Sequence, residues 1–219
     1  MSAKPRGVFV VIEGIDGAGT TTQMELYAES LRAQGRKVHT TREPSTGQIG
    51  SFIRGVLTRK TELASRPSFD LMALLFAADR LDHVRGEIEP ALADGAVVIS
   101  DRYDLSSLAY QSVASDTGLP AHEVVLWIRS LNRFARRPDI TLVVDVSADV
   151  AAERRKRRGG PEDLYETQVL QARLAKAYIH AEVLVPGDKV VHVRGDGSID
   201  EVAELIRAAL RPYVLAGDA

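Results

Sequence analysis

The chain has 219 residues, of which 45% are hydrophobic, and a formal net charge of −2 at pH 7. This length is typical of one α/β domain, and the small net charge provides no overall basic field for nucleic acid. Cysteine is absent, which excludes disulfides and thiolate-bound metals, and no apolar run approaches the about 20 residues of a membrane-spanning helix. We therefore expect a single cytoplasmic domain over residues 1–219, with no membrane or nucleic-acid partner.

Five short apolar runs, each typical of a buried strand, alternate with segments whose apolar residues recur at helical spacing. This alternation predicts right-handed crossovers and a three-layer α/β fold, with a five-stranded parallel sheet covered by helices on both faces. Such sheets bind ligands at the carboxyl ends of their strands, so the residues that follow each run are the candidates for a site. The runs cover residues 8–12, 37–41, 96–100, 140–146 and 189–194.

A glycine-rich segment at residues 14–21, with the sequence GIDGAGTT, connects the first strand to the first helix. It matches the phosphate-binding loop, except that Thr20 stands where that motif has lysine. Backbone N–H groups and the helix N-terminus would bind phosphates there, and Thr21 keeps the hydroxyl that ligates Mg²⁺. Taken alone, the segment is equally compatible with an ordinary strand–helix turn. The residues predicted to hold the phosphates of a donor nucleotide are Gly14, Gly17, Ala18, Gly19, Thr20, Thr21 and Thr22.

Charged side chains at the ends of other strands favour a second anionic ligand. Arg42 follows the second run and Arg102 follows the third, so both should lie at the sheet edge that carries the glycine-rich loop. Two arginines beside a phosphate site favour a phosphate-bearing acceptor over pairing with surface acids. Asp101 ends the third run, where P-loop enzymes have a metal-associated carboxylate, although a helix cap is the alternative. Asp16, inside the loop, could orient an acceptor hydroxyl or satisfy the turn backbone.

Six motifs of the chain together resemble the thymidylate kinase family, in that family's order and spacing. The resemblance implies a P-loop NTPase fold of the nucleoside monophosphate kinase type. It implies phosphoryl transfer from ATP to dTMP, giving dTDP and ADP in dTTP synthesis. It also implies Mg²⁺ as a cofactor, a homodimer and a mobile lid. The motifs are EGIDGAG at 13–19, REP at 42–44, FAADR at 76–80, DRY at 101–103, SSLAYQ at 106–111 and PD at 138–139.

The resemblance implies roles in acceptor binding for residues that match these motifs. Phe76 would stack on the thymine ring. Arg80, four residues further along a helix expected over 67–93, would hydrogen-bond a base carbonyl from the same helix face. Arg42 and Arg102 would hold the phosphate of dTMP.

Four further residues would contact the sugar and the base in the same resemblance. Asp16 would meet the 3′-hydroxyl, while Tyr110 and Ser107 would line the sugar pocket, with Tyr110 crowding a 2′-hydroxyl. Gln111 would lie near the base. The ordinary alternatives are that Phe76 is a core aromatic residue, which is the commoner fate of phenylalanine, and that Ser107 and Gln111 cap or pack helices.

Residues 154–158 read RRKRR and are followed by GGP at 159–161. A basic helix that breaks in this way is typical of a hinged phosphate clamp, so we expect a lid over about 148–163. Arg154 and Arg158 are four residues apart and would share one helix face. The alternatives are a solvated basic surface or an RNA-binding patch, which nearby acidic residues and the negative net charge disfavour.

The missing loop lysine makes the lid the expected source of positive charge. Because residues 14–21 contain neither lysine nor arginine, the chain resembles family members that carry a catalytic arginine in the lid. The lid departs from the family at 163–166, where DLYE has leucine in place of a common arginine. We expect an active kinase whose catalytic residues are Asp16, Arg102, Arg154 and Arg158.

Two other functions are compatible with the sequence. Thr20 could mark a catalytically impaired nucleotide-binding homologue, although the retained acceptor residues argue against such decay. Alternatively, the chain could be a kinase for another or a modified pyrimidine deoxynucleotide. Arg42 and Arg102 disfavour an uncharged nucleoside as the acceptor.

Overall fold

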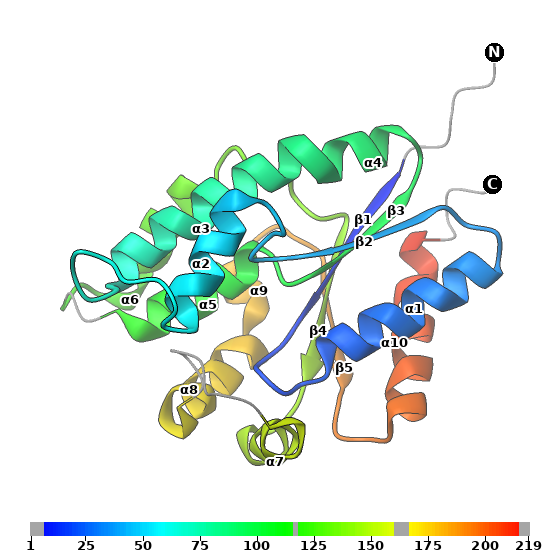
Figure 1. Ribbon diagram of the computed structural model, residues 1–219. Helices are drawn as coiled ribbons and strands as arrows, with labels where there is room; N and C mark the ends of the chain where they lie inside the picture. The colour runs from blue at the N-terminus through cyan, green and yellow to red at the C-terminus, as the bar shows by residue number, and fades with distance from the viewer. Residues whose placement is uncertain (1–6, 116–117, 160–166, 215–219) are drawn as a thin grey trace.

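The computed structural model describes residues 7–115, 118–159 and 167–214. In these ranges strands and helices alternate along the chain, as the sequence predicts (Figure 1). The strands are β1 (Val8–Glu13), β2 (Val38–Arg42), β3 (Val97–Asp101), β4 (Ile140–Asp145) and β5 (Val190–Arg194). The helices are α1 (Thr20–Ala33), α2 (Gln48–Leu57), α3 (Phe69–His83), the π-helical segment η1 (Val84–Ile88), α4 (Glu89–Ala93), α5 (Asp104–Ala114), α6 (Ala121–Leu131), α7 (Ala148–Arg158), α8 (Gln168–Ile179), α9 (Ala181–Leu184) and α10 (Ile199–Val214).

The five strands form one parallel sheet in the order β2-β3-β1-β4-β5, which confirms the predicted sheet. β1 is therefore the central strand, flanked by β3 and β4. The pairing register brings Asp101 opposite both Ile12 of β1 and Arg42 of β2. The carboxyl ends of these strands consequently lie together, at the sheet edge where parallel α/β sheets bind ligands.

Alternate side chains of β1 enter different parts of the core, as the two-residue repeat of a strand requires. Val10 and Ile12 belong to the largest buried cluster, which also contains apolar residues of α1 and α10. Phe9 and Val11 belong to a second cluster, formed with residues of η1, α4 and β3. Helices thus cover both sides of the strand that carries the glycine-rich loop, and this fixes the position of the loop.

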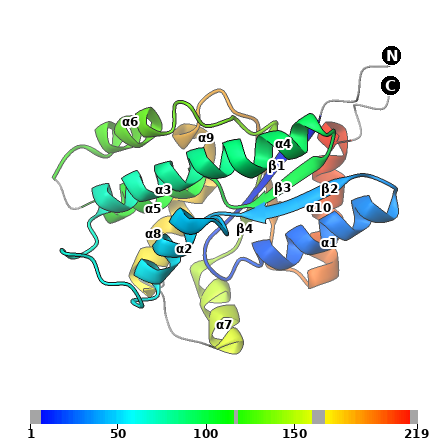
Figure 2. The same cartoon turned by 45° about the horizontal axis from the view of Figure 1, so that its top comes forward.

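The helix expected over 67–93 begins at Phe69, and its middle part, η1, is π-helical instead of α-helical. The π-helical segment ends two residues before Pro90, whose ring nitrogen has no hydrogen to donate to the carbonyl group four residues earlier. α3 and α4 run almost in line (Figure 2). The prediction of one long helical stretch is therefore correct apart from its first two residues and the π-helical turn at 84–88.

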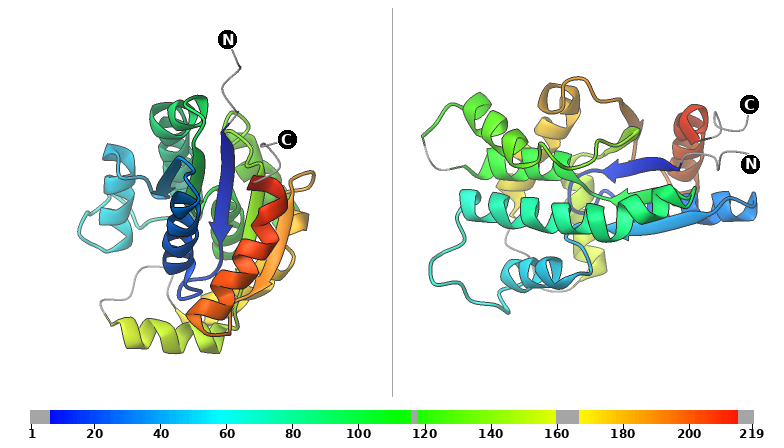
Figure 3. Two further views of the ribbon diagram at one scale, coloured as in Figure 1. Left: turned by 90° about the vertical axis from the view of Figure 1, so that its right-hand side faces the viewer. Right: turned by 90° about the horizontal axis from the view of Figure 1, so that it is seen from above.

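α7 lies at the end of the molecule toward which β1 points (Figure 3, left). It contains the basic sequence at 154–158, and the rest of the predicted lid, from residue 160 onward, lies outside the described residues. None of the helices that the structure describes combines the length and apolar character needed to cross a membrane.

Candidate active site

The glycine-rich loop adopts a conformation that depends on two of its glycines. Gly17 and Gly19 have φ angles of 93° and 92°, in the left-handed region that side chains other than hydrogen disfavour. Gly17 also approaches α7 so closely that a Cβ atom would clash with the carbonyl oxygen of Ala151. α1 begins at Thr20, within the segment 14–21, so the free N–H groups of its first turn face the space above the loop.

This space is a cavity of about 690 Å³, called the loop cavity below. It takes in six of the seven residues predicted to hold donor phosphates, whereas Gly14 is not among its lining residues. A Cβ atom at Gly14 would lie 2.9 Å from Cβ of Ala18, which explains the glycine by packing within the loop. The lining residues include Asp16 to Gln23, Asp101, Arg102, Gly195, Gly197 and four arginines of α7.

Thr21 and Asp101 both line the loop cavity and contact each other. The hydroxyl of Thr21 donates to Oδ2 of Asp101, while Oδ1 of Asp101 is buried without a hydrogen-bond partner. Among the described residues, no cluster of three or more histidine, cysteine, aspartate or glutamate side chains could hold a metal by itself. One carboxylate beside a hydroxyl suits Mg²⁺, which keeps several water ligands and shares substrate phosphates.

A second cavity, of about 180 Å³, adjoins the first and is called the aromatic cavity below. Phe76 is half-buried on α3, where it packs against the apolar cluster of Ile53, Val56 and Met72 and also lines this cavity. Its ring therefore belongs both to the core and to the candidate site. The cavity is lined by Asp16, Glu43, Pro44, Leu57, Phe76, Arg80, Arg102, Tyr103, Ser106, Ser107, Tyr110 and Gln111.

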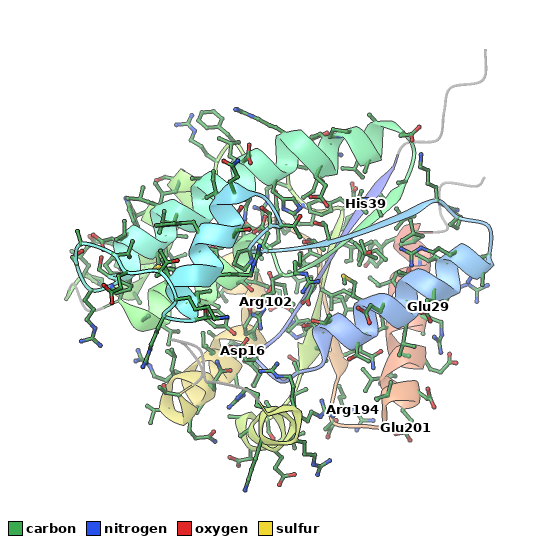
Figure 4. All side chains as sticks on the ribbon, in the orientation of Figure 1. Asp16, Glu29, His39, Arg102, Arg194 and Glu201 are labelled. Atoms are coloured by element: carbon green, nitrogen blue, oxygen red, sulfur yellow. The ribbon has the colours of Figure 1, made fainter. Side chains whose placement is uncertain are left out.

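Asp16 and Arg102 line both cavities and so form the wall between them. Nη2 of Arg102 lies 2.7 Å from Oδ1 of Asp16, and the two side chains point toward each other (Figure 4). Tyr110 donates to Oδ2 of Asp16 at 3.0 Å, and its ring lies 5.2 Å beneath the guanidinium of Arg102. Arg102 has a φ of 72°, which is rare for a residue with a side chain. Such backbone strain is typical of functional positions.

Arg80 is almost completely buried beneath the aromatic cavity and makes a dense set of polar contacts. Its Nη2 atom forms an ion pair with Oε2 of Glu43 at 2.7 Å and donates to Oγ of Ser107 at 3.0 Å. Its Nη1 atom donates to Oδ1 of Asn132 at 2.6 Å. These contacts fix the guanidinium, which still borders the cavity next to the ring of Phe76.

Arg42 and Gln111 occupy contrasting positions among the predicted acceptor residues. Gln111 is 1% exposed, lines the aromatic cavity, and has a side-chain oxygen without a hydrogen-bond partner. Arg42 is exposed at the end of β2 and is not among the residues that line the two cavities. The structure thus brings Arg102, but not Arg42, to the wall between them.

Glu13 is a buried carboxyl group directly below this wall, at the end of β1. It accepts hydrogen bonds from the backbone N–H groups of Tyr103 and Ser106 and from the hydroxyls of Ser106 and Tyr178. Burial raises the pKa of Glu13 to about 7, although the charge of Arg102 and these hydrogen bonds act in the opposite direction. The cost of desolvation outweighs the favourable contacts.

The raised pKa of Glu13 predicts a loss of stability between about pH 4.5 and pH 7. Over this range Glu13 of an unfolded chain, with its ordinary pKa of 4.5, loses its proton, whereas Glu13 of the folded chain retains it. The free energy of unfolding should therefore fall as pH rises, by up to about 3 kcal/mol in total. Urea denaturation across this pH range should show that Glu13→Gln removes this fall, while Glu25→Gln at an exposed position on α1 retains it. If the free energy of unfolding fell with pH as steeply in Glu13→Gln as in wild type, the expectation would be contradicted.

Four arginines of α7 line the loop cavity, two more than the sequence singled out. Nη1 of Arg154 donates to the carbonyl oxygen of Ala18 at 3.2 Å, and Nη2 donates to that of Gly195 at 2.8 Å. Arg154 thereby connects the phosphate loop to the turn after β5. Arg155 donates to the carbonyl oxygen of Asp16. The four lining arginines are Arg154, Arg155, Arg157 and Arg158.

Two polar residues of α8 reach the same wall and were not predicted. Gln171 contacts Asp16, and the hydroxyl of Tyr178 lies 2.9 Å from both Glu13 and Ser106. The two residues are seven positions apart and therefore share one face of α8. The buried glutamine of α8 has no local sequence signal, because its partner lies 155 residues away in the chain.

A phosphate loop after the central strand, together with an aromatic second cavity that shares an arginine with it, defines a P-loop phosphotransferase that acts on a small acceptor. The family model described as "Thymidylate kinase" matches residues 12–206. The chain belongs to the thymidylate kinase family, which consists of transferases that phosphorylate dTMP with ATP.

Individual relatives are similar over nearly their full length. A probable thymidylate kinase of Pyrococcus abyssi is 38% identical, over 96% of this chain and 98% of that protein. The corresponding protein of Thermococcus gammatolerans is 39% identical, over 96% and 99%. The thymidylate kinase of Caldicellulosiruptor saccharolyticus is 33% identical, over 94% and 96%.

Proposed function

We propose that the chain binds ATP in the loop cavity and dTMP in the aromatic cavity, and that the phosphoryl group passes between them at Asp16 and Arg102. The observation that carries this proposal is that these two side chains border both cavities. An oxygen of the dTMP phosphate bonds to the γ-phosphorus of ATP while the bond from that phosphorus to the β-γ bridging oxygen breaks. The electron pair leaves with ADP, and dTDP is formed.

The aromatic cavity suits a nucleotide with a flat base. Phe76 stacks on the thymine ring, while Arg80 and Gln111 offer polar groups to the base edge. Asp16 accepts a hydrogen bond from the 3′-hydroxyl. Supporting this, the fixed guanidinium of Arg80 and the unpartnered oxygen of Gln111 both border the cavity.

Four further contacts are proposed for the sugar and the phosphate of dTMP. Tyr110 and Ser107 line the sugar pocket, and the ring of Tyr110 crowds a 2′-hydroxyl. Arg102 holds the phosphate of dTMP, and Arg42 assists from the end of β2. The family resemblance is the support for Arg42.

Arginines of the lid replace the charge that a lysine at position 20 would supply. Thr20 is 7% exposed and contributes a hydroxyl and a methyl group to the loop cavity instead. We assign the missing charge to Arg154 and Arg158, which line the same cavity. Positive groups aimed at the transferring phosphates stabilise the charge of the transition state, as an arginine finger does.

Thr21 and Asp101 would hold Mg²⁺ together with the phosphates of ATP. The buried, unpartnered Oδ1 atom of Asp101 supports this assignment. When bound, the ion neutralises charge on the phosphates and orients them. The chain's own residues need supply no general base, because a phosphate monoester is largely dianionic at neutral pH. They position two anions and offset the repulsion between them.

A panel of acceptors tests the proposed function. With ATP as donor and ADP release as the readout, dTMP should exceed dUMP, dCMP and dGMP in kcat/KM by at least about tenfold, because the cavity is built for one base. Thymidine, which lacks the phosphate that Arg102 binds, should not turn over. A faster rate with another monophosphate would assign a different acceptor. Binding of ATP without turnover on any acceptor would identify a catalytically impaired homologue.

The homodimer implied by the family resemblance remains part of the proposal. Leu74 on α3 and Leu126 on α6 are exposed, at 49% and 62%, on two helices that contact each other. They offer apolar surface that a second copy could cover. Sedimentation velocity measures this oligomeric state directly.

A further inference from the structure

Asp16 is held on three sides by helices or strand ends that are far apart in the sequence. Arg102 and Tyr110 contact its carboxylate, and Arg155 of α7 donates a hydrogen bond to its backbone carbonyl oxygen. The remaining contacts come from Gln171 of α8, which is 0% exposed.

Gln171 binds Asp16 through both ends of its side-chain amide. Nε2 of Gln171 lies 2.7 Å from Oδ2 of Asp16, and the backbone N–H of Asp16 donates to Oε1 of Gln171 at 3.2 Å. The partners fix the orientation of the amide, since the opposite orientation would set an oxygen against a carboxylate and an N–H group against an N–H group. The glutamine therefore holds the side chain and the backbone of Asp16 in one fixed relation.

This arrangement limits the directions in which Asp16 can accept another hydrogen bond. A carboxylate has about four lone-pair sites. Three of them face Arg102, Tyr110 and Gln171. One direction remains for a ligand, and Asp16 lines the aromatic cavity. Without Gln171, the carboxylate would keep its charge and its contacts with Arg102 and Tyr110, but it would lose the contact that fixes it relative to its own backbone N–H group.

We propose that Gln171 is a positioning residue that aims the carboxylate of Asp16 at the 3′-hydroxyl of the acceptor and so sets the preference for acceptors that carry this hydroxyl. The inference rests on the proposed contact between Asp16 and the sugar. Through Gln171, α8 would contribute to the acceptor site and favour acceptors that carry a 3′-hydroxyl. Gln171 acts through Asp16 and does not touch the reacting atoms.

The experiment compares dTMP with its 3′-deoxy analogue as acceptors, with ATP as the donor. The readout is the selectivity ratio, which is kcat/KM for dTMP divided by kcat/KM for the analogue. Asp16→Ala should bring this ratio close to one. Gln171→Met has a similar volume without the amide, and it should lower the ratio by about tenfold, the effect of one hydrogen bond to a charged group. The KM for ATP should stay unchanged.

A second variant provides a pH signature that a structural role would not produce. Gln171→Glu keeps an oxygen for the backbone N–H of Asp16 but sets a second carboxylate against its side chain. The ratio should be low at neutral pH and recover as the pH falls, because protonation of the introduced group restores a donor. Gln168→Met is the matched control, since Gln168 is exposed on the same helix and bonds to Asp149.

The outcomes separate this inference from the function on which it rests. A selectivity ratio that is lost in Asp16→Ala but retained in both Gln171 variants overturns the assignment of Gln171 alone. An equal loss of kcat/KM for both acceptors in Gln171→Met shows that the residue only stabilises the fold. If the selectivity ratio is unchanged in Asp16→Ala, Asp16 does not contact the 3′-hydroxyl, and the role assigned to Gln171 is overturned as well. The proposal that the chain phosphorylates dTMP would still stand.

Discussion

Replacing Arg102 with methionine is expected to lower kcat/KM for dTMP by about 10²–10³-fold, the cost of removing one charged donor from a transferring phosphate. Arg102 is the cationic side chain that borders both cavities. Its guanidinium is already oriented by Asp16, by Ser106 at 3.2 Å and by the ring of Tyr110. Little reorganisation is therefore needed when two phosphates arrive. Steady-state kinetics with dTMP and ATP measure the effect.

Two companion variants show whether the geometry or the charge of Arg102 matters. Arg102→Lys keeps the charge but loses the planar fork of donors, and it should recover only part of the lost rate. Arg173→Met removes an arginine from the exposed side of α8 and should leave the rate unchanged. If Arg102→Met stays within about threefold of wild type, the wall between the cavities is not the place of transfer.

Removing Arg154 and Arg158 together is expected to lower kcat by about 10³-fold, at the lower end of the effect of an arginine finger. Each single change to alanine should cost less. Both side chains line the loop cavity, and Arg154 is held in place by the carbonyl groups of Ala18 and Gly195. Rapid-quench measurement of ADP formation would isolate the chemical step from product release.

Lys156 provides the matched control for this experiment. It lies on the same helix and carries the same charge, but it is not among the residues that line the loop cavity. Lys156→Ala should therefore leave kcat unchanged. Intact turnover in the Arg154 and Arg158 variants, singly and together, would show that these arginines of α7 take no part in catalysis.

The sheet and many of the residues that line the two cavities could be predicted because their signals are local in the sequence. The apolar runs predict the strands, the glycine-rich segment predicts residues of the loop cavity, and the motif around Phe76 and Arg80 predicts residues of the aromatic cavity. Polar contacts between distant segments left no such signal. The contact of Gln171 with Asp16 and that of Arg155 with the same residue depend on how α7 and α8 pack over the loop.

Two expectations show where local patterns reach their limit. The helical pattern over 67–93 is continuous in its apolar residues, but the missing N–H of Pro90 favours a π-helical segment that the pattern does not contain. Arg42 and Arg102 follow neighbouring strands in similar positions, yet only Arg102 lines the two cavities. Its left-handed backbone, with a φ of 72°, is a tertiary feature that the residue type does not predict.

A kinetic cycle between position 20 and the lid tests most directly whether the charge has moved from the loop to α7. The four proteins are wild type, Thr20→Lys, the double variant Arg154→Ala with Arg158→Ala, and all three changes combined. If the lid supplies the charge, Thr20→Lys should change kcat of the wild type by less than about threefold but raise kcat of the lid variant by at least about tenfold. The same factor in both backgrounds would show that the two positions act independently and would contradict the account.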